Sequence, residues 1–116
     1  MSRRKKFVLL GATGSIGEST LRVLRKHPDK LELLGVSANQ QEEKLRTIVH
    51  EFQVPHAHLG TSPKNPEAFS SATTLSSGSS NLNALASHDD ADVVVVAIVG
   101  SAGLGPTLAA LNAGKD

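Results

Sequence analysis

Three glycines near the start of the chain have the spacing of a phosphate-binding turn. Gly11, Gly14 and Gly17 directly follow the apolar run at residues 7–10. In such a turn the first glycine permits a tight bend, the second lets the backbone approach a pyrophosphate, and the third lets the next helix pack on the strand. The N-terminus of that helix would attract phosphates. The spacing predicts a dinucleotide site, and a turn without a ligand is the alternative.

The residues after the second expected strand bear on which dinucleotide would bind. NAD-binding domains tend to place Asp or Glu there to accept hydrogen bonds from the ribose hydroxyls. This chain has S-A-N-Q-Q at 37–41, and its first carboxylate comes at Glu42. Because a carboxylate would repel the 2′-phosphate of NADP, its absence favours NADP. No Arg or Lys lies closer than Lys44, and a polar turn that caps a helix is the other interpretation.

A run of small residues follows the most strongly apolar segment of the chain, residues 92–99. The sequence A-I-V-G-S-A-G-L-G-P-T-L occupies 97–108. It would lie at the carboxyl edge of the sheet, where doubly wound sheets bind ligands. Contact with a ligand and simple loop packing are equally compatible with this run.

The elements that must position these residues alternate between strands and helices. Apolar runs and β-branched residues predict strands at 7–10, 31–37, 56–59, 73–76 and 92–99. Helical spacing and helix-start signals predict helices at 15–27, 41–52 and 81–87, and from Pro106 onward. The first strand is an unbroken apolar run, as expected when both faces are buried. We therefore expect an α/β fold, with a doubly wound, mostly parallel sheet of the Rossmann-like kind.

Composition excludes several classes of function. The 116 residues suffice for one domain, 1–116. The formal net charge of +1 lacks the excess of positive charge that is typical of proteins that bind nucleic acid or membranes. The absence of cysteine rules out thiol chemistry and is compatible with the cytoplasm.

His56 and His58 alternate on an expected strand without a third ligand nearby, which makes a poor metal site. The acidic residues at 89–92 are expected in a solvated turn, and no catalytic set can be assembled.

Two motifs resemble the 1-deoxy-D-xylulose 5-phosphate reductoisomerase family, whose members act in the non-mevalonate route to isoprenoids. Residues 11–21 read G-A-T-G-S-I-G-E-S-T-L, close to the family's G-S/A-T-G-S-I-G-x-S-T-L. Residues 97–115 are similar to the family's A-I-V-G-x-A-G-L-x-P-T-L-x-A-x-x-A-G-K. The resemblance spans nearly the whole chain and is least informative at 56–88.

The resemblance implies a role for particular residues in binding NADPH. The pyrophosphate would be held by Thr13, Gly14, Ser15 and Ile16. The adenosine ribose and its 2′-phosphate would be flanked by Asn39, Gln40 and Gln41. Many members have a basic residue and then Asn at the positions of Gln40 and Gln41, so this chain departs from the family there. Ala97 and Ile98 would lie near the nicotinamide.

The resemblance also implies what the rest of such an enzyme supplies. In the family the sequence continues into an A-N-K-E segment and a catalytic domain that provides acidic ligands for Mg²⁺ or Mn²⁺. The full-length enzyme, typically a homodimer, would convert 1-deoxy-D-xylulose 5-phosphate to 2-C-methyl-D-erythritol 4-phosphate with NADPH. These 116 residues alone would bind the cofactor and be inactive. The alternatives are the cofactor domain of another NADP-dependent reductase and a stand-alone nucleotide-sensing module.

Overall fold

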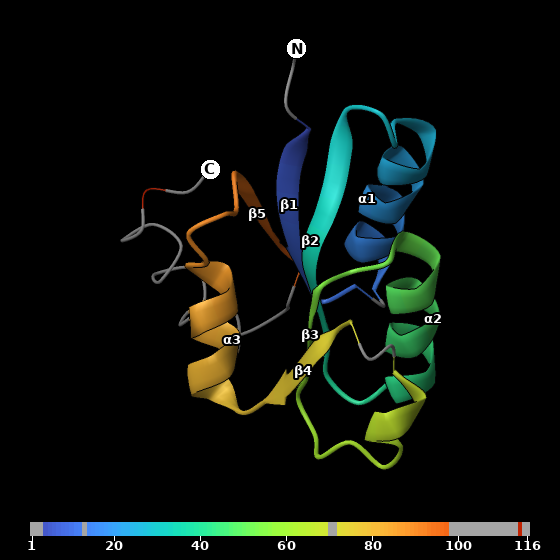
Figure 1. Ribbon diagram of the computed structural model, residues 1–116, viewed down its shortest axis with the longest axis vertical. Coiled ribbons are helices and arrows are strands. Elements are labelled where there is room, and N and C mark those ends of the chain that lie inside the picture. The colour runs from blue at the N-terminus through green and yellow to red at the C-terminus, as the bar shows by residue number, and fades with distance from the viewer. Residues whose placement is uncertain (1–3, 13, 70–71, 98–113, 115–116) are drawn as a thin grey trace.

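A single parallel sheet organises the part of the chain that the computed structural model describes, residues 4–12, 14–69, 72–97 and 114. Within those residues it has five strands in the order β4-β3-β2-β1-β5 (Figure 1). The strands are β1 (Lys5–Leu10), β2 (Leu31–Ala38), β3 (His56–Leu59), β4 (Thr74–Ser77) and β5 (Val93–Val96). Every neighbouring pair is parallel, which confirms the expected Rossmann-like α/β fold.

Helices cover both faces of the sheet. Helices α1 (Ser15–Lys26) and α2 (Glu42–Phe52) lie on one face, and α3 (Ser79–Ala86) lies on the other (Figure 1). The short 3-10 helix η1 (Pro66–Ala68) precedes β4. The connections β1–α1–β2 and β2–α2–β3 run in the same direction across the sheet. Because such connections between parallel strands are right-handed, they place α1 and α2 on the same face. After β4 the chain returns to β5 on the far side of β1, so the strand order reverses at β1, where folds of this kind bind ligands.

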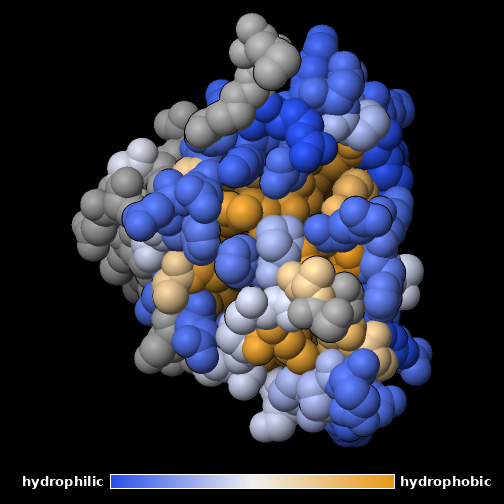
Figure 2. Space-filling model, in the orientation of Figure 1, coloured by the Kyte–Doolittle hydropathy of each residue, from blue (hydrophilic) through white to orange (hydrophobic). Residues whose placement is uncertain are grey.

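The apolar core is divided by the sheet into two clusters. Leu9 belongs to the cluster under α1 and α2, whereas Val8 and Leu10 belong to the cluster under α3. This burial on both faces explains the unbroken apolar run in β1. Hydrophobic side chains show mainly over the strands in the view of Figure 2, and hydrophilic ones cover the outer sides of the helices.

The predicted elements are confirmed with shifted ends wherever the structure describes them, and β5 differs most. It spans Val93–Val96 and is only half-buried, because no strand lies on its far side among the described residues. Residues 98–99 and the helix expected from Pro106 lie outside the described part of the chain. None of the helices in that part is long and apolar enough to cross a membrane.

The expectation of a solvated acidic turn is wrong for Asp92. Its carboxylate accepts a hydrogen bond from the backbone N–H of Lys6, at 2.8 Å, and its own N–H donates to the Lys6 carbonyl, also at 2.8 Å. Both bonds join the start of β5 to β1. Asp92 therefore aligns these two strands, a contact between residues too far apart in sequence for the local pattern to reveal.

Candidate functional site

In the turn after β1, Gly11 and Gly17 have the backbone conformation and the close packing that the glycine spacing predicts. Gly11 has a φ of 84°, in the left-handed region that favours glycine. A Cβ atom on Gly17 would lie 2.6 Å from the carbonyl carbon and oxygen of Ala12 and from the carbonyl oxygen of Gly11. Gly11 therefore permits the bend, and Gly17 lets α1 pack directly on the turn.

Gly14 serves a different purpose, because its surroundings are open. It is the N-cap residue of α1, with φ −90° and ψ −178°, a conformation that any residue adopts, and no side chain caps the helix. Apart from its chain neighbours, a Cβ atom built on Gly14 meets no atom of the described residues within 4 Å. A side chain here would occupy the space in front of the first N–H groups of α1, which is where a helix N-terminus receives a phosphate. The turn thus fits a pyrophosphate.

The other residues predicted to hold the pyrophosphate begin α1. Ser15 and Ile16 are exposed, and Ile16 is 62% accessible. Thr13 lies outside the described residues. Ser15 and Ile16 are therefore accessible to a ligand at the N-terminus of α1.

A buried serine on β2 holds the glycine turn in place. The N–H of Gly11 donates to Oγ of Ser37 at 3.0 Å and to its carbonyl oxygen at 3.2 Å, and the N–H of Ala12 donates to the same carbonyl at 2.8 Å. Ser37 is only 3% exposed. Sequence reasoning missed this residue, and the only signal was a hydroxyl among the uncharged residues 33–38 of the strand.

The second group of predicted site residues lies at the same edge of the sheet. Asn39, Gln40 and Gln41 follow β2 and are all exposed. Because β1 and β2 are parallel and Leu10 pairs with Ser37, both strands deliver the residues after them to one edge. The structure therefore brings Gly14, Ser15 and Ile16 to the same edge of the sheet as the residues that follow β2.

One residue expected near the nicotinamide also reaches this edge. Ala97 follows β5, and its N–H donates to the carbonyl oxygen of Leu10 at 2.8 Å. This bond places Ala97 beside the end of β1, where the glycine turn starts. Ile98, its expected companion, lies outside the described residues.

Gly60, at the end of β3, positions Asn39. The N–H of Gly60 donates to the Ala38 carbonyl at 2.9 Å, and the N–H of Thr61 donates to the Asn39 carbonyl at 3.0 Å. A Cβ atom on Gly60 would collide with Oδ1 of Asn39 and lie 3.0 Å from its carbonyl oxygen. The side chain of Asn39 therefore packs on the backbone of Gly60, where any larger residue would displace it, a contact that the sequence alone did not reveal.

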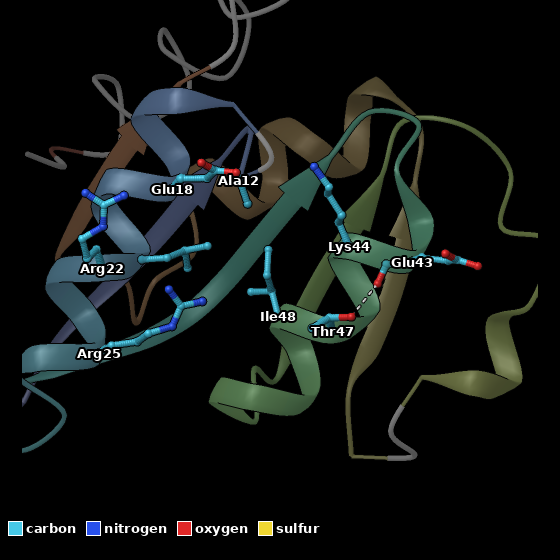
Figure 3. A pocket seen from close by; sticks show the side chains of 9 residues that line it. Ala12, Glu18, Arg22, Arg25, Glu43, Lys44, Thr47 and Ile48 are labelled. Atoms are coloured by element: carbon cyan, nitrogen blue, oxygen red, sulfur yellow. Dashed lines mark hydrogen bonds between the residues drawn. The ribbon is translucent and has the colours of Figure 1, made fainter.

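Two hollows open beside these residues. The first, which we call the helix groove, lies between α1 and α2 and has a volume of about 410 Å³ (Figure 3). Its walls include Ala12 of the turn, Glu18 and Arg22 of α1, and Lys44 of α2. The second, which we call the loop hollow, has a volume of about 510 Å³. Its lining residues include Gln40, Gln41, Lys44, Arg46, Thr61, Ser62 and Lys64.

Charged side chains fix the borders of both hollows. The carboxylate of Glu42 accepts hydrogen bonds from the backbone N–H groups of Lys64 and Asn65, both at 2.8 Å. These two bonds lower the pKa of Glu42, so it stays charged and ties the loop after β3 to α2. Arg25 of α1 bonds Glu51 of α2, with Nη2 and Oε1 2.9 Å apart. This pairing raises the pKa of Arg25 and lowers that of Glu51.

Comparison with known proteins agrees with the resemblance seen in the motifs. Residues 7–116 match the family model of 1-deoxy-D-xylulose 5-phosphate reductoisomerase. The reductoisomerase of Ralstonia pickettii (strain 12J) is 44% identical over 116 residues, which cover 95% of this chain and 29% of that protein. The reductoisomerase of Acinetobacter baumannii (strain SDF) is 43% identical over 114 residues, covering 92% of this chain and 28% of that protein.

Solved structures show the same likeness. The reductoisomerase from Zymomonas mobilis in complex with NADPH superposes with a TM-score of 0.89 at 31% identity, covering 97% of this chain and 31% of that one. A DOX-P reductoisomerase in complex with NADPH, fosmidomycin and magnesium gives a TM-score of 0.86 at 36% identity, covering 96% of this chain and 28% of that one. The chain thus spans less than a third of the length of the relatives it matches.

Proposed function

Because the chain belongs to the 1-deoxy-D-xylulose 5-phosphate reductoisomerase family, we propose that residues 1–116 form the NADPH-binding domain of such an enzyme. The observation that carries this proposal is the glycine turn at the point where the strand order reverses, with open space at Gly14. Two similar solved structures are complexes with NADPH, which supports the choice of ligand.

The proposed binding residues form two groups along the carboxyl edge of the sheet. The pyrophosphate group comprises Thr13, Gly14, Ser15 and Ile16. The ribose group comprises Asn39, Gln40 and Gln41. Support comes from the exposure of the described members and from the parallel pairing of β1 with β2, which delivers both groups to one edge.

The longer protein would carry out the family's reaction. We propose that it converts 1-deoxy-D-xylulose 5-phosphate to 2-C-methyl-D-erythritol 4-phosphate, as a homodimer that uses Mg²⁺ or Mn²⁺. The NADPH bound at this domain would supply the hydride for the reduction. We assign no metal ligand and no catalytic residue to residues 1–116, which alone would bind the cofactor without turnover.

Calorimetric titration of the chain with NADPH and, separately, with NADH tests the proposal. We expect saturable binding of NADPH with one site per chain and weaker binding of NADH. Failure to bind either dinucleotide would contradict the proposed function and would leave the glycine turn with a purely structural role. Equal affinities would support the site but contradict the preference for NADPH.

A further inference from the structure

One lysine lies where the helix groove and the loop hollow meet. Lys44, in the first turn of α2, lines both hollows, and among the described residues no other Lys or Arg does so. Figure 3 shows its side chain extending toward the end of the groove that holds Ala12, whereas the carboxylate of Glu43 points away from α1. Lys44 therefore borders both the hollow that reaches the glycine turn and the hollow that is lined by the residues after β2.

Arg25, Arg46 and Lys64, which also line these hollows, have carboxylate neighbours, whereas Arg22 lines the helix groove alone. Arg25 is paired with Glu51, and the positive charges of Arg46 and Lys64 act on the carboxylate of Glu42. No ion pair or hydrogen bond of the Lys44 side chain occurs within the described part of the chain. Its ammonium group can thus engage an incoming anion without first breaking an ion pair, from a position that borders both hollows.

The proposed cofactor would bring an anion to this position. If the pyrophosphate lies at Gly14, the adenosine half extends toward the end of β2 and the neutral side chains of Gln40 and Gln41. The 2′-phosphate distinguishes NADPH from NADH, and phosphate groups are bound tightly by hydrogen bonds from cationic donors. Lys44 lies one helical turn beyond these glutamines and lines the loop hollow together with them.

We propose that Lys44 binds the 2′-phosphate of NADPH and determines the preference of this chain for NADPH over NADH. The proposal rests on the function proposed above. It assigns the phosphate to a residue other than Gln40 and Gln41, the two positions where many family members have a basic residue and Asn. Lys44 would act from the first turn of α2, with Gln40 and Gln41 supplying neutral hydrogen bonds.

The nearby carboxylates restrict where the phosphate can lie. Glu18 lines the helix groove and not the loop hollow, so a phosphate on the loop side of Lys44 avoids it. Glu42 borders the loop hollow, but its oxygens already accept two backbone N–H bonds. Glu43 lines both hollows, but its carboxylate points away from α1, whereas Lys44 extends toward the end of the groove that holds Ala12 (Figure 3). The phosphate would therefore bind Lys44 on the side away from the Glu43 carboxylate.

Titration of wild type and Lys44→Gln with NADPH, NADH, 2′,5′-ADP and 5′-ADP tests the proposal. Loss of a charge-assisted hydrogen bond should raise the dissociation constant for NADPH and 2′,5′-ADP by about tenfold. The dissociation constants for NADH and 5′-ADP should not change. Because Lys44 is exposed, the variant should keep the thermal melting curve of wild type.

Two further variants separate this role from a general effect of charge. Lys26→Gln removes the same charge from the exposed last turn of α1, outside both hollows, and should leave all four affinities unchanged. Lys64→Gln removes a cation that lines only the loop hollow and should lower the affinity for 2′,5′-ADP less than Lys44→Gln does.

Each other outcome overturns a distinct claim. If wild type prefers NADPH and Lys44→Gln keeps that preference, the role of Lys44 is wrong and the proposed function stands. If Lys44→Gln weakens NADPH and NADH equally, Lys44 does not determine the preference. If wild type binds NADPH and NADH equally, there is no preference for Lys44 to determine. If wild type binds neither, the proposed function fails, and the role of Lys44 with it.

Discussion

Gly14 and Gly17 lie three residues apart, yet a glycine is favoured at each for a different physical reason. At Gly17 a side chain has no room, because backbone atoms of Ala12 and Gly11 lie 2.6 Å from where its Cβ atom would be. At Gly14 a side chain has ample room, and that room is where the pyrophosphate would bind. Substitutions at the two positions should therefore separate binding from folding.

Gly14→Val should abolish cofactor binding and leave the fold intact. The valine side chain would fill the space before the N-terminus of α1, whereas the backbone conformation at Gly14 is one that any residue adopts. We expect at least a tenfold rise in the dissociation constant for NADPH by calorimetry and an unchanged circular dichroism spectrum. Unchanged affinity in this variant would rule out the proposed pyrophosphate site.

Gly17→Ala should instead destabilise the protein. Its Cβ atom would press on the carbonyl groups of Gly11 and Ala12, and overpacking of this kind costs about 1–3 kcal/mol. Urea denaturation should show a lower midpoint than that of wild type or Gly14→Val. A wild-type midpoint would show that α1 can move away from the turn without loss of stability.

Gly60→Ala should weaken NADPH binding through Asn39. The added methyl group collides with the Asn39 amide, so that side chain has to leave the position it holds against Gly60. We expect a severalfold loss of affinity in wild type and little further loss in an Asn39→Ala background. Additive losses in the double variant would show that Gly60 acts on binding by another route.

At the scale of elements, side chains rather than backbone pairing join α2 to its surroundings. The carboxylate of Glu42 holds the loop after β3 through the N–H groups of Lys64 and Asn65. Arg25 and Glu51 connect α1 to α2 on the outer side, where an exposed ion pair contributes little to stability. Glu42 therefore has the larger effect on the shape of the loop hollow.

Glu42→Gln should loosen the loop without unfolding the domain. A neutral amide accepts weaker hydrogen bonds than a carboxylate, so the amide protons of Lys64 and Asn65 should exchange faster with solvent. Hydrogen exchange followed by NMR measures this directly, with Glu43→Gln as a control that removes the neighbouring charge. Equal exchange rates in wild type and Glu42→Gln would show that the loop is held by other contacts.

At the scale of the whole molecule, one ionisable pair lies at the end of the sheet opposite to the proposed site. His56 begins β3, and its ring lies 4.7 Å from that of His88, between centroids. Burial and the proximity of His88 lower the pKa of His56, although Asp90 acts in the opposite direction. The folded protein therefore resists protonation of His56 more than the unfolded chain does.

Stability should consequently fall as the solution becomes acidic. The folded pKa of His56 is below its ordinary value of 6.5, so its contribution is complete above that pH and is lost as the pH drops through the folded pKa. Thermal unfolding between pH 8 and 5 should show this loss, and His56→Phe should reduce it. An identical pH dependence in the variant would assign the loss to other groups.

The sequence by itself determined the features that depend on local spacing. The glycine turn, the helices α1 and α2, and the two-sided burial of β1 follow from residues that are neighbours in the chain. The same spacing placed Gly14, Ser15 and Ile16 at a helix N-terminus and Asn39, Gln40 and Gln41 at the end of a strand. Parallel pairing then made one edge of the sheet the expected site.

Only the tertiary structure decided which distant residues support that edge. Ser37 bonds the glycine turn, Gly60 packs on Asn39, and Asp92 aligns β5 with β1. From the sequence, Lys44 was only the nearest cation after the second strand, and the tertiary structure places it where the two hollows meet. These contacts depend on strand order and register, which bring residues together across the sheet, and no local pattern in the chain encodes which residues will meet.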